Sequence, residues 1–277
     1  MRIATVNVNG IRAAARKGMG EWLTASAPDI LLLQEVRADE QIAVDLLPGY
    51  EAAIWPCRIK GRAGVGVAVR DGGPATLGEL RYGVAAPGTE EPDVDSGRWL
   101  EADLSLTGFD GVEQLTVISA YLHSGQLGTE KMDQKYAHLE LVDARMAELL
   151  ESSESGGPQV IMAGDLNVVR SERDIKNWKP NHNKTAGVMD EEIAHLEGWF
   201  ASGWIDVARW LAPGEQGPYT WWSQRGRAFD NNAGWRLDYQ VATPRLAKRA
   251  STFTVDRADS HDTRWSDHAP LVVDYAF

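Results

Sequence analysis

The sequence contains a single cysteine, Cys57, so the chain cannot form an internal disulfide. This fits a reducing compartment, and no second cysteine or paired histidine lies near Cys57 at a spacing that would predict zinc. No stretch approaches the roughly 20 apolar residues of a membrane span. The opening residues, MRIATVNVNG, lack the apolar core and cleavage pattern of a signal peptide. We therefore expect a cytoplasmic protein without membrane contact.

Basic residues are scarce relative to acidic ones, with 28 Lys and Arg against 40 Asp and Glu and a formal net charge of −12. Taken alone, this charge argues against a nucleic-acid binder, because neutralising phosphates requires cations. However, many cations lie in three Gly- or Asn-rich stretches. These are CRIKGRAGVGVAVR (Arg58, Lys60, Arg62, Arg70), RSERDIKNWKPNHNK (Arg170, Arg173, Lys176, Lys179, Lys184) and SQRGRAFDNNAGWR (Arg225, Arg227, Arg236). Each stretch alone is explained by solvated charge, but three on an acidic body favour one polarised face.

Apolar patterns predict strands that alternate with helices. Strands are expected in RIATVNVN, DILLLQE, GVGVAVRD, WLEADLSL, LTVISAYLH, QVIMAGDLNVV, YTWW, WRLDYQVA and LVVDY. Helices are expected over 10–28 (stopping at Pro28), over 131–151, and from Met189 to Phe200. Both halves begin with an apolar strand that runs into Asn or Asp and is followed by a helix. We therefore expect one domain, residues 1–277, built of two similar halves, with 85–96 as a polar surface loop.

Polar side chains recur where these apolar strands end. They are Asn7 and Asn9, Glu35, Asp165 and Asn167, Asp238, and the adjacent Asp267 and His268. Each alone could be a turn, a helix cap or a solvated side chain. Together, so many polar side chains at the ends of buried strands cost desolvation free energy unless they gather around a common partner. Nearly all offer hard oxygen ligands, which suit Mg²⁺ or Mn²⁺ better than zinc. The set therefore predicts metal-assisted phosphoryl chemistry.

Five motifs, VNVNGIRA, LLLQE, AGDLN, GWRLDY and SDHAPL, resemble in sequence and order the exonuclease III group of apurinic/apyrimidinic endonucleases, within the endonuclease–exonuclease–phosphatase superfamily. The resemblance spans essentially the whole chain. It implies a DNase I-like four-layered α/β sandwich, with two mostly antiparallel central sheets flanked by helices. It also implies a Mg²⁺-dependent DNA repair nuclease, with Mn²⁺ as a substitute, acting as a monomer on double-stranded DNA with abasic sites or 3′-blocked ends. Such an enzyme would cut 5′ to an abasic site and have 3′→5′ exonuclease and 3′-phosphatase activity.

The resemblance also implies roles for single residues. Glu35 would be the principal metal ligand with Asn7 beside it, and Asp267 would lie near the same ion. Asp165 would orient or deprotonate the attacking water, Asn167 would steady Asp165 and the phosphate, and Tyr121 would contact the phosphate. His268 would bind the scissile phosphate oxygen, with Asp238 orienting the imidazole. Asp165, Asn167 and His268 are also candidate metal ligands. The number of metals and the choice between Asp165 and His268 as general base stay open.

Contacts to DNA are implied by the same resemblance. Trp221, Trp235 and Leu237 would form a pocket for an abasic sugar, which an intact nucleotide would not enter. Core packing is the alternative for these three, and a shared pocket requires that they lie near the end of the strand that carries Asp238. The segment KPNHNKTAG resembles a DNA-contacting loop, whereas LHSGQLGTEKMDQK lacks an arginine that some members insert into DNA. The candidate polar contacts are Arg58, Lys60, Arg62, Arg170, Lys176, Lys179, Asn181, Asn183, Lys184 and Arg225.

Two other functions stay open at this stage. One is a phosphatase of the same superfamily that acts on inositol or lipid phosphoesters. The other is a non-catalytic DNA-binding module that kept the fold.

Overall fold

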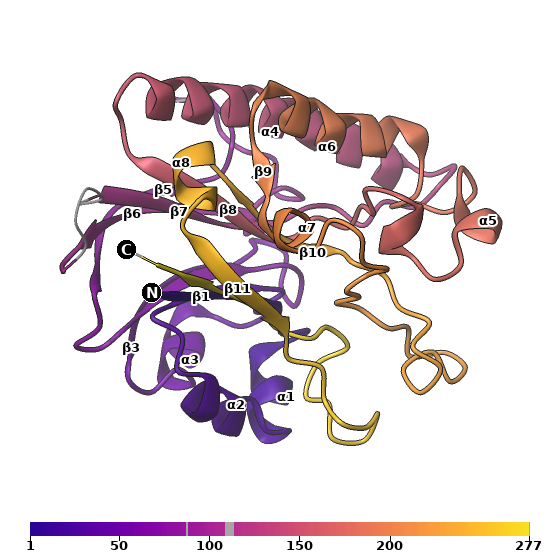
Figure 1. The fold of residues 1–277 in the computed structure, drawn as a ribbon, viewed down its shortest axis with the longest axis horizontal. Coiled ribbons are helices and arrows are strands. Elements are labelled where there is room, and N and C mark those ends of the chain that lie inside the picture. Colours follow the sequence, from indigo (N-terminus) through magenta and orange to yellow (C-terminus); the bar gives the residue numbers. More distant parts are fainter. Residues whose placement is uncertain (87, 109–113, 277) are drawn as a thin grey trace.

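The computed structural model describes residues 1–86, 88–108 and 114–276, whose strands form two six-stranded sheets that face each other (Figure 1). The first sheet has the order β11 (Ala250–Val255), β12 (Leu271–Tyr275), β1 (Arg2–Asn7), β2 (Ile30–Gln34), β4 (Val65–Arg70), β3 (Tyr50–Trp55). The second has the order β5 (Ala75–Tyr82), β6 (Trp99–Leu106), β7 (Gln114–Tyr121), β8 (Gln159–Asp165), β10 (Asp238–Ala242), β9 (Ile205–Asp206).

Each sheet is antiparallel except for one parallel pair near its centre. In the first sheet β1 runs parallel to β2, with Asn7 opposite Gln34. In the second sheet β7 runs parallel to β8, with Tyr121 opposite Asp165. The carboxyl ends of parallel strands meet at one edge of a sheet, so each pair brings its terminal polar residues together. The expected fold class, an α/β sandwich with two mostly antiparallel sheets, is confirmed.

Helices cover the outer faces of both sheets (Figure 1). The outer face of the second sheet is covered by α4 (Glu130–Glu154) and α6 (Asp190–Ser202), which confirm two of the expected helices. The first sheet is covered by α1 (Ile11–Arg16), α2 (Met19–Ser26) and α3 (Glu40–Asp45). The short elements are η1 (Glu172–Asp174), α5 (Trp178–Asn181), α7 (Val207–Leu211) and α8 (Pro244–Ala247). Within the described ranges, no helix combines the length and apolar character needed to cross a bilayer.

The main core lies between the two sheets. It includes Ile3 and Leu32 from the first sheet and Val117 and Ile161 from the second, all fully buried. β2 is buried along its whole length, as its continuous apolar run predicts. A hydrogen bond from Gln34 Nε2 to Ser119 Oγ, 2.9 Å long, joins the sheets close to the edge where the polar residues collect.

Several sequence predictions need correction. The helix expected over 10–28 is two helices, because Gly18 adopts a left-handed conformation (φ 115°) between α1 and α2. YTWW is not a strand: Trp221 forms only isolated bridges with Trp235 and His268, and β10 begins at Asp238. The segment 85–96 is not wholly a surface loop, since Glu91, Asp95 and Ser96 are buried. Four strands, β3, β5, β9 and β11, are not anticipated in the sequence.

Candidate active site

The ends of the two parallel strand pairs contact each other directly. Asn7 is the last residue of β1. Its side-chain amide donates to Glu35 Oε1 (3.0 Å) and Asp165 Oδ2 (2.8 Å). The Tyr121 hydroxyl, at the end of β7, donates to the same Glu35 oxygen at 2.6 Å. Burial, together with the charges of Glu35 and Asp165, holds the pKa of Tyr121 well above its usual value. Residues from both sheets therefore converge on one buried carboxylate cluster.

The turn after β8 holds the Asp165 carboxylate from several sides. The backbone N–H of Asn167 donates to Asp165 Oδ1 at 3.0 Å, and the Asn167 side chain donates to Oδ2 at 3.2 Å. The same side-chain amide donates to the carbonyl of Leu122 (3.0 Å), which fixes its orientation. Asp165 is 1% exposed, and this burial raises its pKa. The carboxylate is thus oriented by hydrogen bonds and poised to accept a proton.

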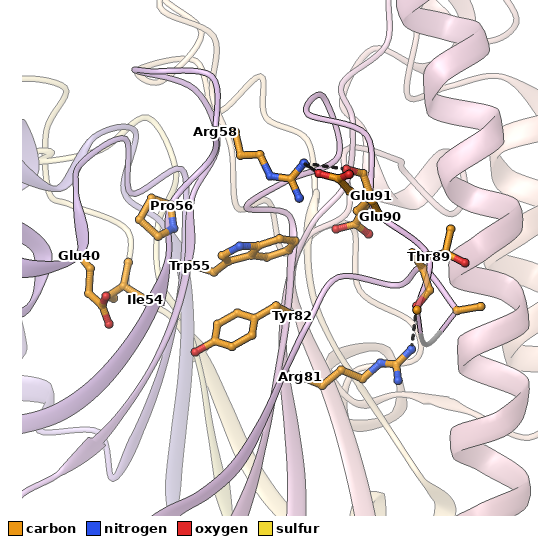
Figure 2. Close-up of a pocket in the computed structure, with 13 residues that line it drawn as sticks. Glu40, Ile54, Trp55, Pro56, Arg58, Arg81, Tyr82, Thr89, Glu90 and Glu91 are labelled. Carbon is orange, nitrogen blue, oxygen red and sulfur yellow. Dashed lines mark hydrogen bonds and ion pairs between the residues drawn. The ribbon is translucent and has the colours of Figure 1, made fainter.

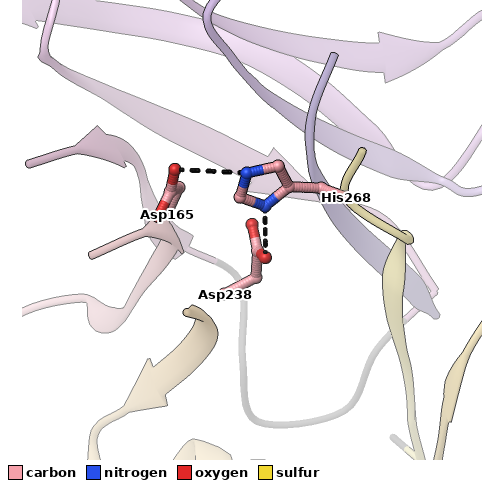
Figure 3. Close-up of side chains that lie close together, drawn as sticks. All are labelled: Asp165, Asp238 and His268. Carbon is pink, nitrogen blue, oxygen red and sulfur yellow. Dashed lines mark hydrogen bonds and ion pairs between the residues drawn. The ribbon is translucent and has the colours of Figure 1, made fainter. Parts of the chain in front are cut away.

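His268 lies between two carboxylates (Figure 3). Its Nδ1 is 2.8 Å from Asp238 Oδ2, and its Nε2 is 3.7 Å from Asp165 Oδ2. Burial alone would lower the pKa of the imidazole, but the charges of Asp238 and Asp165 outweigh burial and raise it. We conclude that the imidazole retains its proton and presents Nε2–H toward Asp165. The 3.7 Å separation is that of an ion pair without a direct hydrogen bond.

Asp267 lies on the side of the first sheet, away from the Asp238 contact. Its carboxylate accepts hydrogen bonds from Asn9 Nδ2 (2.8 Å) and Trp221 Nε1 (3.2 Å). Burial would raise the pKa of Asp267, but the charge of His268 and these hydrogen bonds lower it. Ser266 donates to the backbone carbonyl of Asn7 at 2.7 Å, so the segment before β12 is held against the end of β1.

Three polar residues at this edge have left-handed backbones: Asn9 (φ 46°), Glu35 (φ 49°) and Asn167 (φ 51°). For Glu35 this conformation is uncommon and costs about 1–3 kcal/mol, which persists only where the surroundings fix it. Gly164 allows the close approach of β7 and β8, since a Cβ there would lie 1.8 Å from the carbonyl oxygen of Ala120. The chain therefore bends sharply at the ends of β1, β2 and β8, and these bends aim the polar side chains at one another.

The donor set fits a hard divalent cation. Among the described residues, the buried oxygens Glu35 Oε2 and Asp238 Oδ1 accept no hydrogen bond, although Glu35 Oε2 is ion-paired to Arg37. Oxygen ligands of this kind suit Mg²⁺ or Mn²⁺. Asp165, Asp238 and His268 also bring ligand atoms within 4.8 Å of one another. Because His268 faces a carboxylate on each side, that trio is better explained as an acid–base group. Glu35 with Asn7, and Asp267, are the better candidates to hold an ion.

The three residues predicted to form a sugar pocket pack together beside His268. Trp221, Trp235 and Leu237 belong to one apolar cluster, with the two indole rings 5.6 Å apart. The Trp221 ring is 6.5 Å from the His268 ring. Trp235 and Leu237 precede β10 and do not alternate with Asp238 along a regular strand. All three therefore lie near one end of the strand that carries Asp238, which is the placement that a shared site requires.

Some of the candidate DNA-contacting side chains are exposed to solvent, and others are bonded to groups within the protein. Lys60, Arg62, Lys176, Lys179, Lys184 and Arg225 are exposed. The loop of Lys60 and Arg62 adjoins Glu35, because Val36 N–H donates to the carbonyl of Gly64 at 2.9 Å. Asn181 and Asn183 bond within their own loop, Asn181 to Asn177 and Asn183 to Asp190. The loop 223–236 and α5 project from the same end of the molecule, opposite the two termini (Figure 1).

Arg58 and Arg170 are held by acids. Arg58 pairs with Glu90 and Asp93 beside a hollow of about 570 Å³ that also contains Trp55 and Tyr82 (Figure 2). Arg170 pairs with Glu197 (2.6 Å) and Asp206 (3.6 Å).

Arg236 does not contribute to a basic face, contrary to the sequence pattern. It is 1% exposed and is ion-paired to Asp174 and Asp206.

Sequence patterns missed several residues of the site. Arg37 pairs with Glu35, Ser266 joins β1 to the segment before β12, and Arg98 stacks on the Tyr121 ring at 4.9 Å. Asn9 was noted at a strand end but given no role. Ser266 is adjacent to the Asp-His pair, so its position was the one available signal; the two arginines resemble ordinary surface charge in the sequence.

Comparison with known proteins agrees with this architecture. The Endonuclease/Exonuclease/phosphatase family matches residues 4–268. An exodeoxyribonuclease of Bacillus subtilis is 32% identical over 273 residues, covering 98% of each chain. A DNA-(apurinic or apyrimidinic site) endonuclease of Dictyostelium discoideum is 30% identical over 276 residues, covering 99% of this chain and 70% of the relative. The structure of an AP endonuclease from Archaeoglobus fulgidus superposes with a TM-score of 0.80 at 26% identity, with both chains fully covered. The chain therefore belongs to the endonuclease/exonuclease/phosphatase family, as a nuclease of its exonuclease III and AP endonuclease group.

Proposed function

We propose that this protein is a Mg²⁺-dependent DNA repair nuclease that hydrolyses the phosphodiester 5′ to an abasic site and leaves a 3′-hydroxyl. Its 3′→5′ exonuclease and 3′-phosphatase activities would use the same site on 3′-blocked ends. The observation that carries the proposal is the convergence of Asp165 and His268, 3.7 Å apart, with Glu35 joined to Asp165 through the Asn7 amide. The names of the B. subtilis and D. discoideum relatives support it.

Asp165 is the proposed proton acceptor for the attacking water. Its pKa is raised by burial, and Asn7 and Asn167 hold its carboxylate in place. His268 keeps its proton because of Asp238, so its Nε2–H is suited to donate to a phosphate oxygen where negative charge develops. This division of roles favours Asp165 over His268 as the base. We infer that Tyr121, a neutral phenol whose hydroxyl donates to Glu35 in this structure, donates to the phosphate or the leaving oxygen during the reaction.

A divalent ion held by Glu35, with Asn7 beside it and Asp267 near it, would neutralise phosphate charge and stabilise the leaving oxygen. The chain's own contribution is to keep these oxygens buried and oriented. Tyr121 and Asn7 both donate to Glu35 Oε1, so Glu35 Oε2, which is ion-paired to Arg37, would be the oxygen that holds the ion.

The surroundings support DNA as the substrate. The Trp221, Trp235 and Leu237 cluster beside His268 offers an apolar surface to a flipped sugar that carries no base. On the Asp267 side, a hollow of about 300 Å³ is lined by Lys17 and Arg264 and also by Asp262 and Asp267, and we infer that the two cations contact a flanking phosphate there. The exposed lysines of the 176–184 region would contact the backbone further out.

The direct test uses a duplex with one tetrahydrofuran abasic analogue, incubated with purified protein and Mg²⁺. We expect a single incision 5′ to the analogue, a product that a polymerase can extend, and no cutting when EDTA is present. Free cutting of an intact duplex with no cutting at the analogue would refute the abasic specificity.

A second experiment separates the nuclease from a phosphatase that acts on inositol or lipid phosphoesters. Charge reversal of Lys176 and Lys179 to Glu should weaken DNA binding and make its loss with rising salt less steep, because both side chains are exposed cations and fewer phosphates are then neutralised. Turnover of a small phosphoester would be unaffected. A DNA cleavage rate that equals the wild-type rate at every salt concentration would contradict the proposed role of these residues.

A further inference from the structure

A lysine and a glutamate are buried together beneath the candidate site. Lys135 lies on α4 and Glu192 in the first turn of α6, and neither side chain is exposed to solvent. The ammonium is 2.5 Å from Glu192 Oε1. Burying two charges is expensive, and well-packed apolar residues often replace a buried ion pair without loss of stability. The pair therefore calls for an explanation beyond packing.

Each member of the pair holds a different piece of backbone. Lys135 Nζ donates to the carbonyl of Asn167 at 2.9 Å. Glu192 Oε2 accepts from the backbone N–H groups of Gly187 (2.6 Å) and Met189 (3.1 Å). The first contact fixes the turn that orients Asp165. The second fixes the end of the loop of residues 182–189, which contains the exposed Lys184.

The turn and the loop are also in direct contact. Val169 N–H donates to the carbonyl of Gly187 at 2.9 Å. Gly187 has a φ of 86°, and a Cβ there would lie 2.8 Å from the Asn167 carbonyl oxygen, so only glycine permits this approach. Asn167 itself has a left-handed backbone, which must be stabilised by its neighbours. The ammonium supplies a charged donor at this strained residue.

We propose that Lys135 and Glu192 are positioning residues for the proposed nuclease reaction, on which this inference rests. Lys135 holds the Asn167 backbone so that its N–H and side-chain amide stay directed at Asp165. Glu192 neutralises Lys135 and holds the 182–189 loop against that turn. Neither residue contacts substrate, and each acts through the groups it holds.

Two double variants separate the two roles without leaving an unpaired buried charge. Lys135→Met with Glu192→Gln removes the donor to Asn167 but keeps an acceptor for Gly187 and Met189. We expect kcat on abasic duplex to fall by about 10–100-fold, with KM nearly unchanged and a melting temperature close to wild type. Lys135→Met with Glu192→Leu also removes that acceptor, so KM should rise as well. The matched control is Lys131→Met with Glu191→Gln, which alters exposed residues of the same two helices.

A kcat within about twofold of wild type for the Met/Gln variant would overturn the proposal, because the pair would then be only structural. If that variant folds poorly, Lys135→Arg keeps the ion pair but changes the donor geometry. A normal kcat for that substitution would equally count against positioning.

Hydrogen–deuterium exchange gives a readout independent of cleavage. Amides of residues 165–169 should exchange faster in the Met/Gln variant than in wild type. In the Met/Leu variant, the amides of residues 182–189 should also exchange faster than in wild type. If wild-type protein fails to cut abasic DNA, the proposed function is wrong, yet the exchange data still decide the positioning claim. Unchanged exchange in both variants would refute it.

Discussion

Asp238 Oδ2 lies 2.8 Å from His268 Nδ1, and this contact joins the two sheets, since β10 belongs to the second sheet and His268 precedes β12 of the first. The carboxylate fixes the orientation of the ring and leaves Nε2–H directed toward Asp165. Because both ring nitrogens face carboxylates, the orientation of the imidazole is fixed and its protonated form is stabilised.

Asp238→Asn should impair the reaction and shift its pH dependence. Asp238 raises the pKa of His268, so the protonated imidazole of wild type persists to higher pH. Without that charge the proton is lost at lower pH, and the alkaline limb of the kcat profile should move toward acid. We expect kcat at neutral pH to fall by about 10²–10⁴-fold. Asp230→Asn, at an exposed position, is the control; identical profiles for wild type and Asp238→Asn would contradict the assignment.

Asp165→Asn should remove the proton acceptor while preserving the hydrogen-bonding shape. Single-turnover cleavage should slow by about 10³-fold or more, whereas affinity for abasic duplex measured in EDTA should stay near wild type. Cleavage at close to the wild-type rate would show that Asp165 is not the base.

His138→Leu should stabilise the protein and flatten its acid sensitivity. The imidazole is 1% exposed, neither ring nitrogen has a hydrogen-bond partner among the described residues, and burial lowers its pKa to about 3. Above the ordinary pKa of about 6.5 the group is neutral in both states. Between about pH 6.5 and 3 the unfolded chain binds a proton that the folded one excludes, so the unfolding free energy falls by about 1.4 kcal/mol per pH unit.

Urea unfolding from pH 7 to pH 4 tests this for His138→Leu, with the exposed His261→Leu as control. Burial likewise lowers the pKa of the neighbouring His123, so some acid sensitivity remains in the variant. Parallel stability curves for wild type and His138→Leu would contradict the prediction.

Arg236→Met should be strongly destabilising. The guanidinium is buried against Asp174 (2.6 Å) and Asp206 (2.8 Å), and its removal leaves carboxylates without their partner. The expected loss is about 3–5 kcal/mol in urea unfolding. Arg227→Met, which breaks only an exposed pair with Asp230, should change stability by less than about 1 kcal/mol. Equal losses for the two variants would show that burial does not set the cost.

We propose that residues 1–277 fold as one domain, because the main core takes residues from both sheets. Tryptophan fluorescence and far-ultraviolet circular dichroism should then report a single, coincident urea transition. Two separated transitions would indicate halves that unfold independently.

The sequence predicted interior strands well and edge strands poorly. β2 and β8 are buried along their lengths, so their apolar runs are unmistakable. The four strands that were missed, β3, β5, β9 and β11, occupy the four edges of the two sheets. β5 and β11 are largely exposed and carry polar residues, and β9 has only two residues, so no apolar pattern marks them. The aromatic residues of YTWW predict a strand, but they pack in apolar clusters and form only isolated bridges, without joining the hydrogen-bonded ladder of a sheet.

Within the site, short sequence motifs identified the proposed catalytic residues but not the residues that orient them. Asp238, Asp267 and His268 stand in motifs whose order was informative. Lys135 and Glu192 are 57 positions apart on amphipathic helices, where the sequence cannot distinguish a buried charge from a solvated one. Only packing of α4 against α6 shows that they meet.

The hydrogen bond from Ser266 to the Asn7 carbonyl joins residues 259 positions apart. Closing so long a loop costs chain entropy that only non-local pairing repays, and a fold rich in such contacts is expected to fold slowly. The nuclease should consequently cleave DNA only after the C-terminal strand β12 has paired with β1. A partly folded chain should therefore not cleave DNA. In refolding experiments, cleavage activity should recover more slowly than secondary structure.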